Sequence, residues 1–243
     1  MEHYDGNWGI YDHYFLPFAA RQMTKMSKPF FSTVFTISTH FPYKLPDTLK
    51  ERFTIAGQGR EQNSMSYLDY SLRLFFNEIK NESWYQNTLF VFCADHNIFW
   101  YPTEKVTKYK RFRIPLFFHV PEQRIATPID KPVQQLDIVP SILDMLHYNK
   151  PFMSFGRSIF DSSAPATVVN CIDELYQVID SSCLFGYNEK TDKAAYMYNF
   201  RSDSTLTKNL LQTDPHADVL EQHLKAVMQR FNYSMIHDKL YVK

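Results

Sequence analysis

Apolar and polar residues alternate along the chain in the pattern of an α/β protein, with helix-like and strand-like stretches in turn. Residues 61–81 carry apolar side chains three and four positions apart, from Met65 to Ile79, which predicts a helix with one buried face. The continuous apolar run from Thr88 to Ala94 is typical of a central parallel strand. Further helices are expected at 12–26 (with Asp12 as its N-cap) and 137–147, and further buried strands at 30–38 and 113–120.

The pattern changes beyond about residue 162. Short strand-like segments at 166–171, 182–188 and 193–200 predict a small meander, and an amphipathic stretch at 216–236 predicts a closing helix. No linker rich in Pro, Gly or Ser separates this part from the rest. We therefore expect a main portion at 1–162 and a smaller α+β portion at 163–243 that packs on it.

Charge and composition exclude several classes of function. The chain has 26 Lys and Arg against 26 Asp and Glu, so it lacks the basic surface that general nucleic-acid binding needs. Only 6 of 243 residues are glycine, and no glycine-rich phosphate loop is present. No apolar run reaches the ~18 residues of a membrane span, and the first residues do not resemble a signal peptide.

The cysteines and serines give little support to covalent catalysis. Cys93, Cys171 and Cys183 form neither a disulfide framework nor a pattern of closely paired metal ligands, and a bridge between the last two has no support beyond their presence. We expect Cys93 to face the core from its strand. The sequence also lacks the G-x-S-x-G pattern of serine hydrolases.

Asp95 and His96 are the sharpest chemical feature of the sequence. They directly follow the strand expected at 88–94, and ligands of open α/β sheets bind at the carboxyl ends of strands. A carboxylate oxygen and an imidazole nitrogen suit Mn²⁺, Zn²⁺ or Mg²⁺. The alternative is that Asp95 caps backbone N–H groups beside a surface histidine.

His40 follows the strand expected at 30–38 in the same way. If the two strands are parallel neighbours, His40 and His96 open onto one rim, where a histidine can hold a phosphate or sulfate oxygen. The alternative is a structural loop histidine. Trp8 suits either the wall of an anion site or a core. Arg157, after Gly156, suits either an anion clamp or a helix cap, and Lys105, Lys108, Lys110 and Arg111 form either an attracting patch or a solvated loop.

Taken in order, the motifs resemble the catalytic domain of the lipoteichoic acid synthase group, in the sulfatase branch of the alkaline phosphatase superfamily. The resemblance covers about residues 5–162. The segments that carry it are Trp8-Gly9 with Asp12, Ser38-Thr39-His40-Phe41-Pro42-Tyr43, Tyr67-Leu68-Asp69-Tyr70-Ser71-Leu72, Trp84-Tyr85-Gln86-Asn87-Thr88-Leu89, Ala94-Asp95-His96, Arg113-Ile114-Pro115-Leu116, Gln135-Leu136-Asp137-Ile138-Val139-Pro140-Ser141-Ile142-Leu143 and Phe155-Gly156-Arg157-Ser158.

The resemblance implies a three-layer α/β/α sandwich and an enzyme that acts on phosphate or sulfate esters. Members use a divalent metal ion, Mn²⁺ first, with Mg²⁺, Ca²⁺ or Zn²⁺ as alternatives, and a Thr or a Cys-derived formylglycine as nucleophile. By motif position, Asp95 and His96 match the metal ligands, His40 matches the histidine at the phosphoglycerol head group, and Trp8 matches a tryptophan that lines that site.

This sequence also departs from the family pattern. The nucleophile and an acidic metal ligand lie upstream of the Trp-Gly segment in the family, so we expect no catalytic nucleophile in this chain and a fold that is incomplete at its N-terminus. Asn97 replaces a small residue, and the loop at 98–111 has no further histidine. The family acts outside the cytoplasmic membrane, to which this chain would be tied only through a missing N-terminal segment. The alternatives are a binding module for an anionic head group and a half that complements a separate N-terminal chain.

Overall fold

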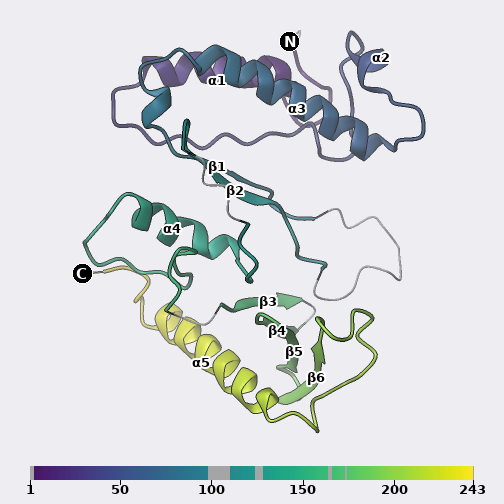
Figure 1. Cartoon of the computed structure of the whole chain (residues 1–243), viewed down its shortest axis with the longest axis vertical. Helices are drawn as coiled ribbons and strands as arrows, with labels where there is room; N and C mark the ends of the chain where they lie inside the picture. The colour runs from purple at the N-terminus through teal and green to yellow at the C-terminus, as the bar shows by residue number, and fades with distance from the viewer. Residues whose placement is uncertain (1–2, 98–109, 124–127, 164–165, 173, 243) are drawn as a thin grey trace. The chain divides into compact units, whose positions relative to one another are not determined.

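The computed structural model describes residues 3–97, 110–123, 128–163, 166–172 and 174–242. These fall into two compact units (Figure 1). The first comprises residues 1–90 together with 118–125, and the second comprises 91–117 together with 126–243. The expected division near residue 162 stays a prediction.

Two long helices form the body of the first unit. Helix α1 (Asp12–Lys25) and helix α3 (Arg60–Ile79) lie side by side, with the short α2 (Lys50–Phe53) between them in the chain (Figure 1). A 3-10 turn, η1 (Tyr85–Asn87), follows α3. The core of this unit is made by Leu16, Ala20, Met23, Phe75, Ile79 and Trp84. Burial of these apolar side chains is the main force that holds the two helices together.

The helix expected at 61–81 is confirmed, and Phe75 and Ile79 are buried as expected, but the N-terminal half of its buried face differs from the expected one. Met65 is 52% exposed, whereas Tyr67 is fully buried. Ser64 and Ser71 are buried on the same face, and each satisfies its hydroxyl on a carbonyl one turn earlier. The spacing of apolar residues pointed to Met65, although two small serines and one tyrosine take up the buried positions in this half of the helix.

The buried strand expected at 30–38 is wrong for this structure. No strand is assigned there, and Phe31 and Phe35 are 81% and 66% exposed. Phe30 and Val34 pack against the helical core instead. Within the described residues, 30–36 make no backbone hydrogen bond to another segment, so the chain is extended without a partner strand.

Two short strands follow in the chain. Strand β1 (Phe90–Cys93) pairs with β2 (Leu116–His119), and the stacked rings of Phe92 and Phe117 lie across this pair. Both expected strands are therefore confirmed in shortened form. Cys93 is exposed, so the expectation that it faces the core is wrong. Among the described residues β1 pairs with β2 alone, so the expectation that it is a central strand stays a prediction.

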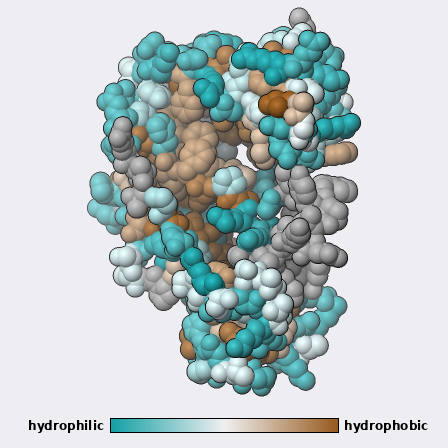
Figure 2. Space-filling view, turned by 45° about the vertical axis from the view of Figure 1, so that its right-hand side comes forward, coloured by the Kyte–Doolittle hydropathy of each residue, from teal (hydrophilic) through white to brown (hydrophobic). Residues whose placement is uncertain are grey.

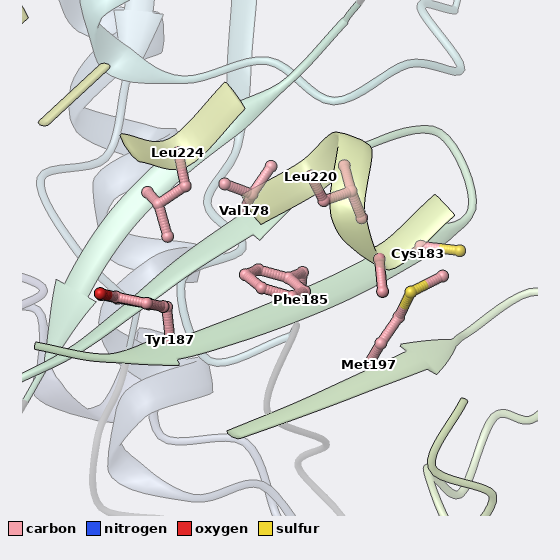
Figure 3. Packing of buried hydrophobic residues seen from close by; sticks show 8 residues of the cluster. Val178, Cys183, Phe185, Tyr187, Met197, Leu220 and Leu224 are labelled. Atoms are coloured by element: carbon pink, nitrogen blue, oxygen red, sulfur yellow. The ribbon is translucent and has the colours of Figure 1, made fainter. Parts of the chain in front are cut away.

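The second unit contains an antiparallel sheet covered by a helix. Its strands are β3 (Val168–Ile172), β4 (Leu175–Ile179), β5 (Cys183–Asn188) and β6 (Lys193–Asn199), paired in that order. Helix α5 (His216–Ile236) contacts β4 and β5, with Leu220 and Leu224 directed at Val178 and Phe185 (Figure 3). The meander and closing helix are confirmed, although β4 was not expected from the sequence.

The same unit holds a 3-10 turn, η2 (Gln135–Asp137), that leads into helix α4 (Ile138–Met145). Lys105 and Lys108 of the expected basic loop lie outside the described residues. Hydrophobic side chains reach the surface in several places (Figure 2). Phe31 and Ile236 are 81% and 78% exposed. In the part of the chain that the structure describes, no helix has the length and apolar character needed to cross a bilayer.

Candidate functional site

Trp8 and His40 lie together in the first unit. Their ring centroids are 4.4 Å apart in an edge arrangement. The Trp8 indole Nε1 and the His40 Nδ1 both reach the carbonyl oxygen of Phe41, each at 2.8 Å. Because Nδ1 of His40 donates to this carbonyl, its Nε2 is the nitrogen that can face a ligand. Trp8 is 60% exposed, so these rings form a surface feature and the core alternative for Trp8 is wrong.

A buried carboxylate fixes the loop that carries Trp8. Asp5 Oδ1 accepts hydrogen bonds from the backbone nitrogens of Asn7, Trp8 and Gly9, at 2.8, 2.9 and 3.0 Å. Burial alone would raise the pKa of Asp5, but these three N–H groups and Lys44 outweigh it and hold the pKa below its ordinary value. The loop is therefore built around an ionised carboxylate.

Asp12 holds the segment that carries His40. It is fully buried, and its two carboxylate oxygens accept hydrogen bonds from the backbone nitrogens of Ile37 and Ser38, at 3.2 and 3.1 Å. The expectation that Asp12 caps helix α1 is wrong, because Tyr11 precedes the helix and Asp12 is its first residue. Burial raises the pKa of Asp12, although its hydrogen bonds with Ser38 and Ile37 oppose that shift.

Asp95 and His96 lie in the second unit, where one residue, Ala94, separates them from the end of β1. The His96 backbone nitrogen donates to Asp95 Oδ1 at 2.9 Å, and the two side chains approach to 3.6 Å between His96 Nε2 and Asp95 Oδ2. His96 Nδ1 lies 2.8 Å from the Asn97 carbonyl oxygen, to which it donates. A histidine that donates from Nδ1 to a carbonyl oxygen typically coordinates a metal ion through Nε2. Both side chains are about half exposed.

This donor set fits a divalent cation but does not complete its coordination. Asp95 supplies a carboxylate oxygen and His96 an imidazole nitrogen, whereas a metal site needs at least one or two further ligands. Among the described residues, no other His, Cys, Asp or Glu joins these two in a compact group. The alternative, that Asp95 only caps backbone, is also visible in its bond to the His96 nitrogen.

Gln135 supports the backbone of this pair. Its side-chain Nε2 donates to the carbonyl oxygens of Ala94 and Asp95, at 2.9 and 3.0 Å. The sequence analysis gave Gln135 as part of a family motif but proposed no role for its side chain. The signal was its place at the start of the turn that leads into α4, two positions before Asp137.

The segments around Asp137 and Arg157 are joined through the backbone. Asp137 is buried; its Oδ2 accepts from the Gln134 nitrogen and its Oδ1 from the Arg157 nitrogen, both at 3.0 Å. Gly156 lies directly on Leu136: a Cβ on this glycine would stand 2.0 Å from the Leu136 carbonyl oxygen. The motif at Gly156 and Arg157 therefore has a packing role, and an anion clamp by the Arg157 side chain stays a prediction.

The four residues chosen from the sequence thus form two local pairs, Trp8 with His40 and Asp95 with His96. The pairs belong to different units, and the expectation that His40 and His96 share one rim stays a prediction. The segments that carry these pairs are held by the side chains of Asp5, Asp12 and Gln135. Sequence reasoning did not predict these supporting hydrogen bonds. Their partners are backbone groups, which carry no residue-specific signal in a sequence.

Comparison with known proteins identifies the family. The sulfatase family model matches residues 1–148. The lipoteichoic acid synthase-like protein YvgJ of Bacillus subtilis is 25% identical over 209 residues, which cover 76% of this chain and 33% of that protein. Lipoteichoic acid synthase 1 of the same organism is 23% identical over 239 residues, 85% of this chain and 37% of the relative. The chain spans about a third of the length of these relatives.

Solved structures share the fold. A protein of the alkaline phosphatase superfamily from Vibrio parahaemolyticus superimposes with a TM-score of 0.80 and 22% identity, over 98% of this chain and 57% of the other. The lipoteichoic acid synthase LtaP from Listeria monocytogenes gives a TM-score of 0.68 and 18% identity, over 93% and 60%. The expected α/β class and alkaline-phosphatase/sulfatase fold are therefore confirmed. With more than half of its residues matched by the sulfatase model, the chain belongs to the sulfatase family and is a lipoteichoic acid synthase-like member of it.

Proposed function

We propose that this chain is the C-terminal part of the catalytic domain of a metal-dependent enzyme that acts on phosphate or sulfate esters, most like a phosphoglycerol transferase. The observation that carries the proposal is the Asp95–His96 pair at the carboxyl end of β1, in a chain of the sulfatase family. Enzymes of this family generally depend on a divalent metal ion.

In this proposal Asp95 and His96 bind the ion through a carboxylate oxygen and Nε2, with Mn²⁺ as the first candidate and Mg²⁺, Ca²⁺ or Zn²⁺ as alternatives. When bound, the metal would polarise the ester oxygens and lower the pKa of a hydroxyl nucleophile. Gln135 keeps the Asp95 backbone in place through its two bonds to carbonyl oxygens.

His40 and Trp8 bind the anionic head group of the substrate in the same proposal. His40 has one ring nitrogen anchored on the Phe41 carbonyl, so the opposite nitrogen can donate to a phosphate or sulfate oxygen when the ring carries a proton there. Trp8, anchored on the same carbonyl, supplies a fixed aromatic wall beside it.

We further propose that the nucleophile and the remaining metal ligands are not in this chain. Two findings support this: the two-donor set at Asp95 and His96, and a length about a third of that of the relatives. A membrane attachment of the whole protein, with the catalytic domain outside the cytoplasm, would depend on such a further segment as well.

The test is turnover of an aryl phosphate and an aryl sulfate by the purified chain in the presence of Mn²⁺. The proposal predicts no turnover above buffer for the 243-residue chain. Turnover that survives rigorous purification and disappears in the Asp95→Ala variant would contradict the missing nucleophile, while supporting the metal role.

A second candidate function is binding without catalysis. The exposed and rigidly anchored Trp8–His40 pair favours it, because this pair needs no nucleophile to hold an anionic head group.

A third candidate is that this chain is one half of an enzyme and pairs with a separate N-terminal chain. The segment that contains the exposed Phe31 and Phe35, which has no partner strand, favours it. Co-expression with the N-terminal part of a lipoteichoic acid synthase would then give a stable equimolar complex, which Phe31→Ser with Phe35→Ser disrupts and the equally exposed Ile236→Ser does not.

A further inference from the structure

A second group of metal-ligating side chains lies in the part of the chain beyond the sulfatase match. Asp180 follows β4, Cys183 opens β5 and His216 opens α5. One carboxylate oxygen, the thiol sulfur and one imidazole nitrogen of these residues all lie within 4.8 Å of one another. Within the described residues, no other trio of His, Cys, Asp or Glu is this compact.

The carboxylate of Asp180 is oriented by its own turn. Its Oδ1 accepts hydrogen bonds from the backbone nitrogens of Ser182 and Cys183, at 2.8 and 2.6 Å. Its other oxygen, Oδ2, lies 2.6 Å from Nε2 of His216. One oxygen therefore holds the turn, and the second is directed at the imidazole. Outer hydrogen bonds that fix a carboxylate in this way are typical of metal ligands.

The thiol of Cys183 lies at the edge of the core. The residue is 3% exposed and stands beside Met197 at one end of the cluster in Figure 3. Its sulfur lies within 4.8 Å of the Asp180 carboxylate oxygen and the His216 imidazole nitrogen, and the Ser182 hydroxyl oxygen is 3.6 Å from it. A cation that replaces the thiol proton would be bound there by a thiolate, a carboxylate and an imidazole.

We propose that Asp180, Cys183 and His216 bind a Zn²⁺ ion that joins the β4–β5 turn to the first turn of α5. Sulfur, nitrogen and oxygen are the donors that Zn²⁺ takes, and three protein ligands with one water complete a tetrahedral site. Around zinc the separation between Nε2 and Oδ2 would widen to about 3.3 Å and that between sulfur and nitrogen would be about 3.6 Å. The three ligand atoms already lie within 4.8 Å of one another and would have to settle at these separations.

The proposed site is open to solvent on one side, and an ion there would stabilise the second unit. The His216 side chain is 39% exposed and that of Asp180 is 15% exposed, so an ion and its water can enter from the His216 side. The ion would fasten the start of α5 to the sheet, next to Leu220 and Phe185 in the same core. The site is independent of Asp95 and His96 and of the proposed catalysis.

The experiment is a titration of the metal-free chain with Co²⁺, a spectroscopic substitute for Zn²⁺. The expected result is the near-ultraviolet absorption of a thiolate–cobalt bond, with the visible bands of tetrahedral cobalt, both removed by added Zn²⁺. Cys183→Ser removes the thiolate band. The matched variants Cys93→Ser and Cys171→Ser, which change the two exposed cysteines, keep it.

A second variant tests whether a lost band in Cys183→Ser comes from lost binding and not from unfolding. His216→Gln alters a partly exposed side chain, so its circular dichroism should match the parent, while Co²⁺ affinity falls by at least about ten-fold. Asp95→Ala should leave the thiolate band unchanged, which separates this site from the proposed catalytic metal. The proposal is overturned if the parent chain shows no thiolate band. It is equally overturned if the band persists in Cys183→Ser or disappears in Cys93→Ser.

Discussion

The carboxylate of Asp12 and the backbone nitrogen of Ser38 are joined by a buried hydrogen bond of 3.1 Å, 26 positions apart in the chain. The other Asp12 oxygen accepts from the Ile37 nitrogen at 3.2 Å. One side chain from the first residue of α1 therefore holds the segment that leads to His40. The position of His40 therefore depends on a buried carboxylate that lies on a different segment of the chain.

Replacing Asp12 should destabilise the protein. Asp12→Ala leaves two backbone N–H groups without their acceptors, which should cost on the order of 2–4 kcal/mol of the free energy of unfolding. Asp12→Asn retains one carbonyl acceptor and should cost less. The measurement is urea unfolding.

The matched control is Asp218→Ala, an exposed acidic residue in the first turn of α5. It should cost below about 1 kcal/mol, the size of an exposed charge–helix interaction. Equal losses for Asp12→Ala and Asp218→Ala would show that Asp12 acts only as a helix-end charge.

The turn around Asp5 should weaken in acid. The folded-state pKa of Asp5 lies below its ordinary value of 3.8, so the unfolded state takes up the proton first as the pH falls. The stabilisation by its carboxylate is therefore complete above that value and is lost as the pH drops below it. The stability difference between the parent and Asp5→Asn should be largest near neutral pH and shrink at pH values below 3.8.

Urea unfolding of both proteins at two pH values measures this difference. Asp69→Asn, which alters an exposed carboxylate paired with Arg73, serves as the control and should show little effect at either pH. A parent–variant difference for Asp5 that grows on acidification would contradict the lowered pKa.

Gly156 should not tolerate a side chain. Alanine would place its Cβ 2.0 Å from the Leu136 carbonyl oxygen, a backbone atom that cannot move aside without shifting the turn before α4. We expect Gly156→Ala to cost about 2–3 kcal/mol in thermal or urea unfolding. Gly59→Ala, whose Cβ would meet only flexible ends of Gln62 and Glu61, should cost below about 1 kcal/mol. A cost for Gly156→Ala no larger than that of Gly59→Ala would contradict this packing.

Sequence reasoning located the elements whose signals are local. Helices α1, α3 and α5 were found because their apolar positions repeat within a few residues. The segment at 30–38 has the composition of a strand, but a strand also needs a partner, and composition does not supply one. Strand β4 was missed because it is only five residues long and follows an acidic pair, Asp173-Glu174.

The candidate site was predicted in part for the same reason. Asp95, His96 and His40 stand at the ends of apolar runs, which is a local signal. The bonds from Gln135 to the carbonyls of Ala94 and Asp95 join positions about forty residues apart, and any carbonyl could have accepted them. The exposure of Cys93 also could not be read from the sequence, because an apolar strand looks the same whether one or both of its faces are covered.

His40 should carry the binding of an anionic head group. Calorimetric titration with glycerol phosphate should detect binding by the parent chain, and His40→Ala should weaken it by about ten-fold, the loss of one charge-assisted hydrogen bond. His237→Ala, at the end of α5, should leave the affinity unchanged. The absence of heat at millimolar ligand would contradict a head-group site in this chain, whether or not catalysis needs further residues.

The most direct test of the central claim is to sequence the DNA upstream of the Met1 codon. The claim is that Asp95, His96 and His40 belong to the rear part of a working ester-transferring enzyme. The account predicts several hundred in-frame codons there that encode membrane helices, an acidic metal ligand and a Thr or Cys nucleophile after a strand. A stop codon and a ribosome-binding site directly before Met1 would contradict it, and catalysis by this chain would then have no nucleophile to draw on.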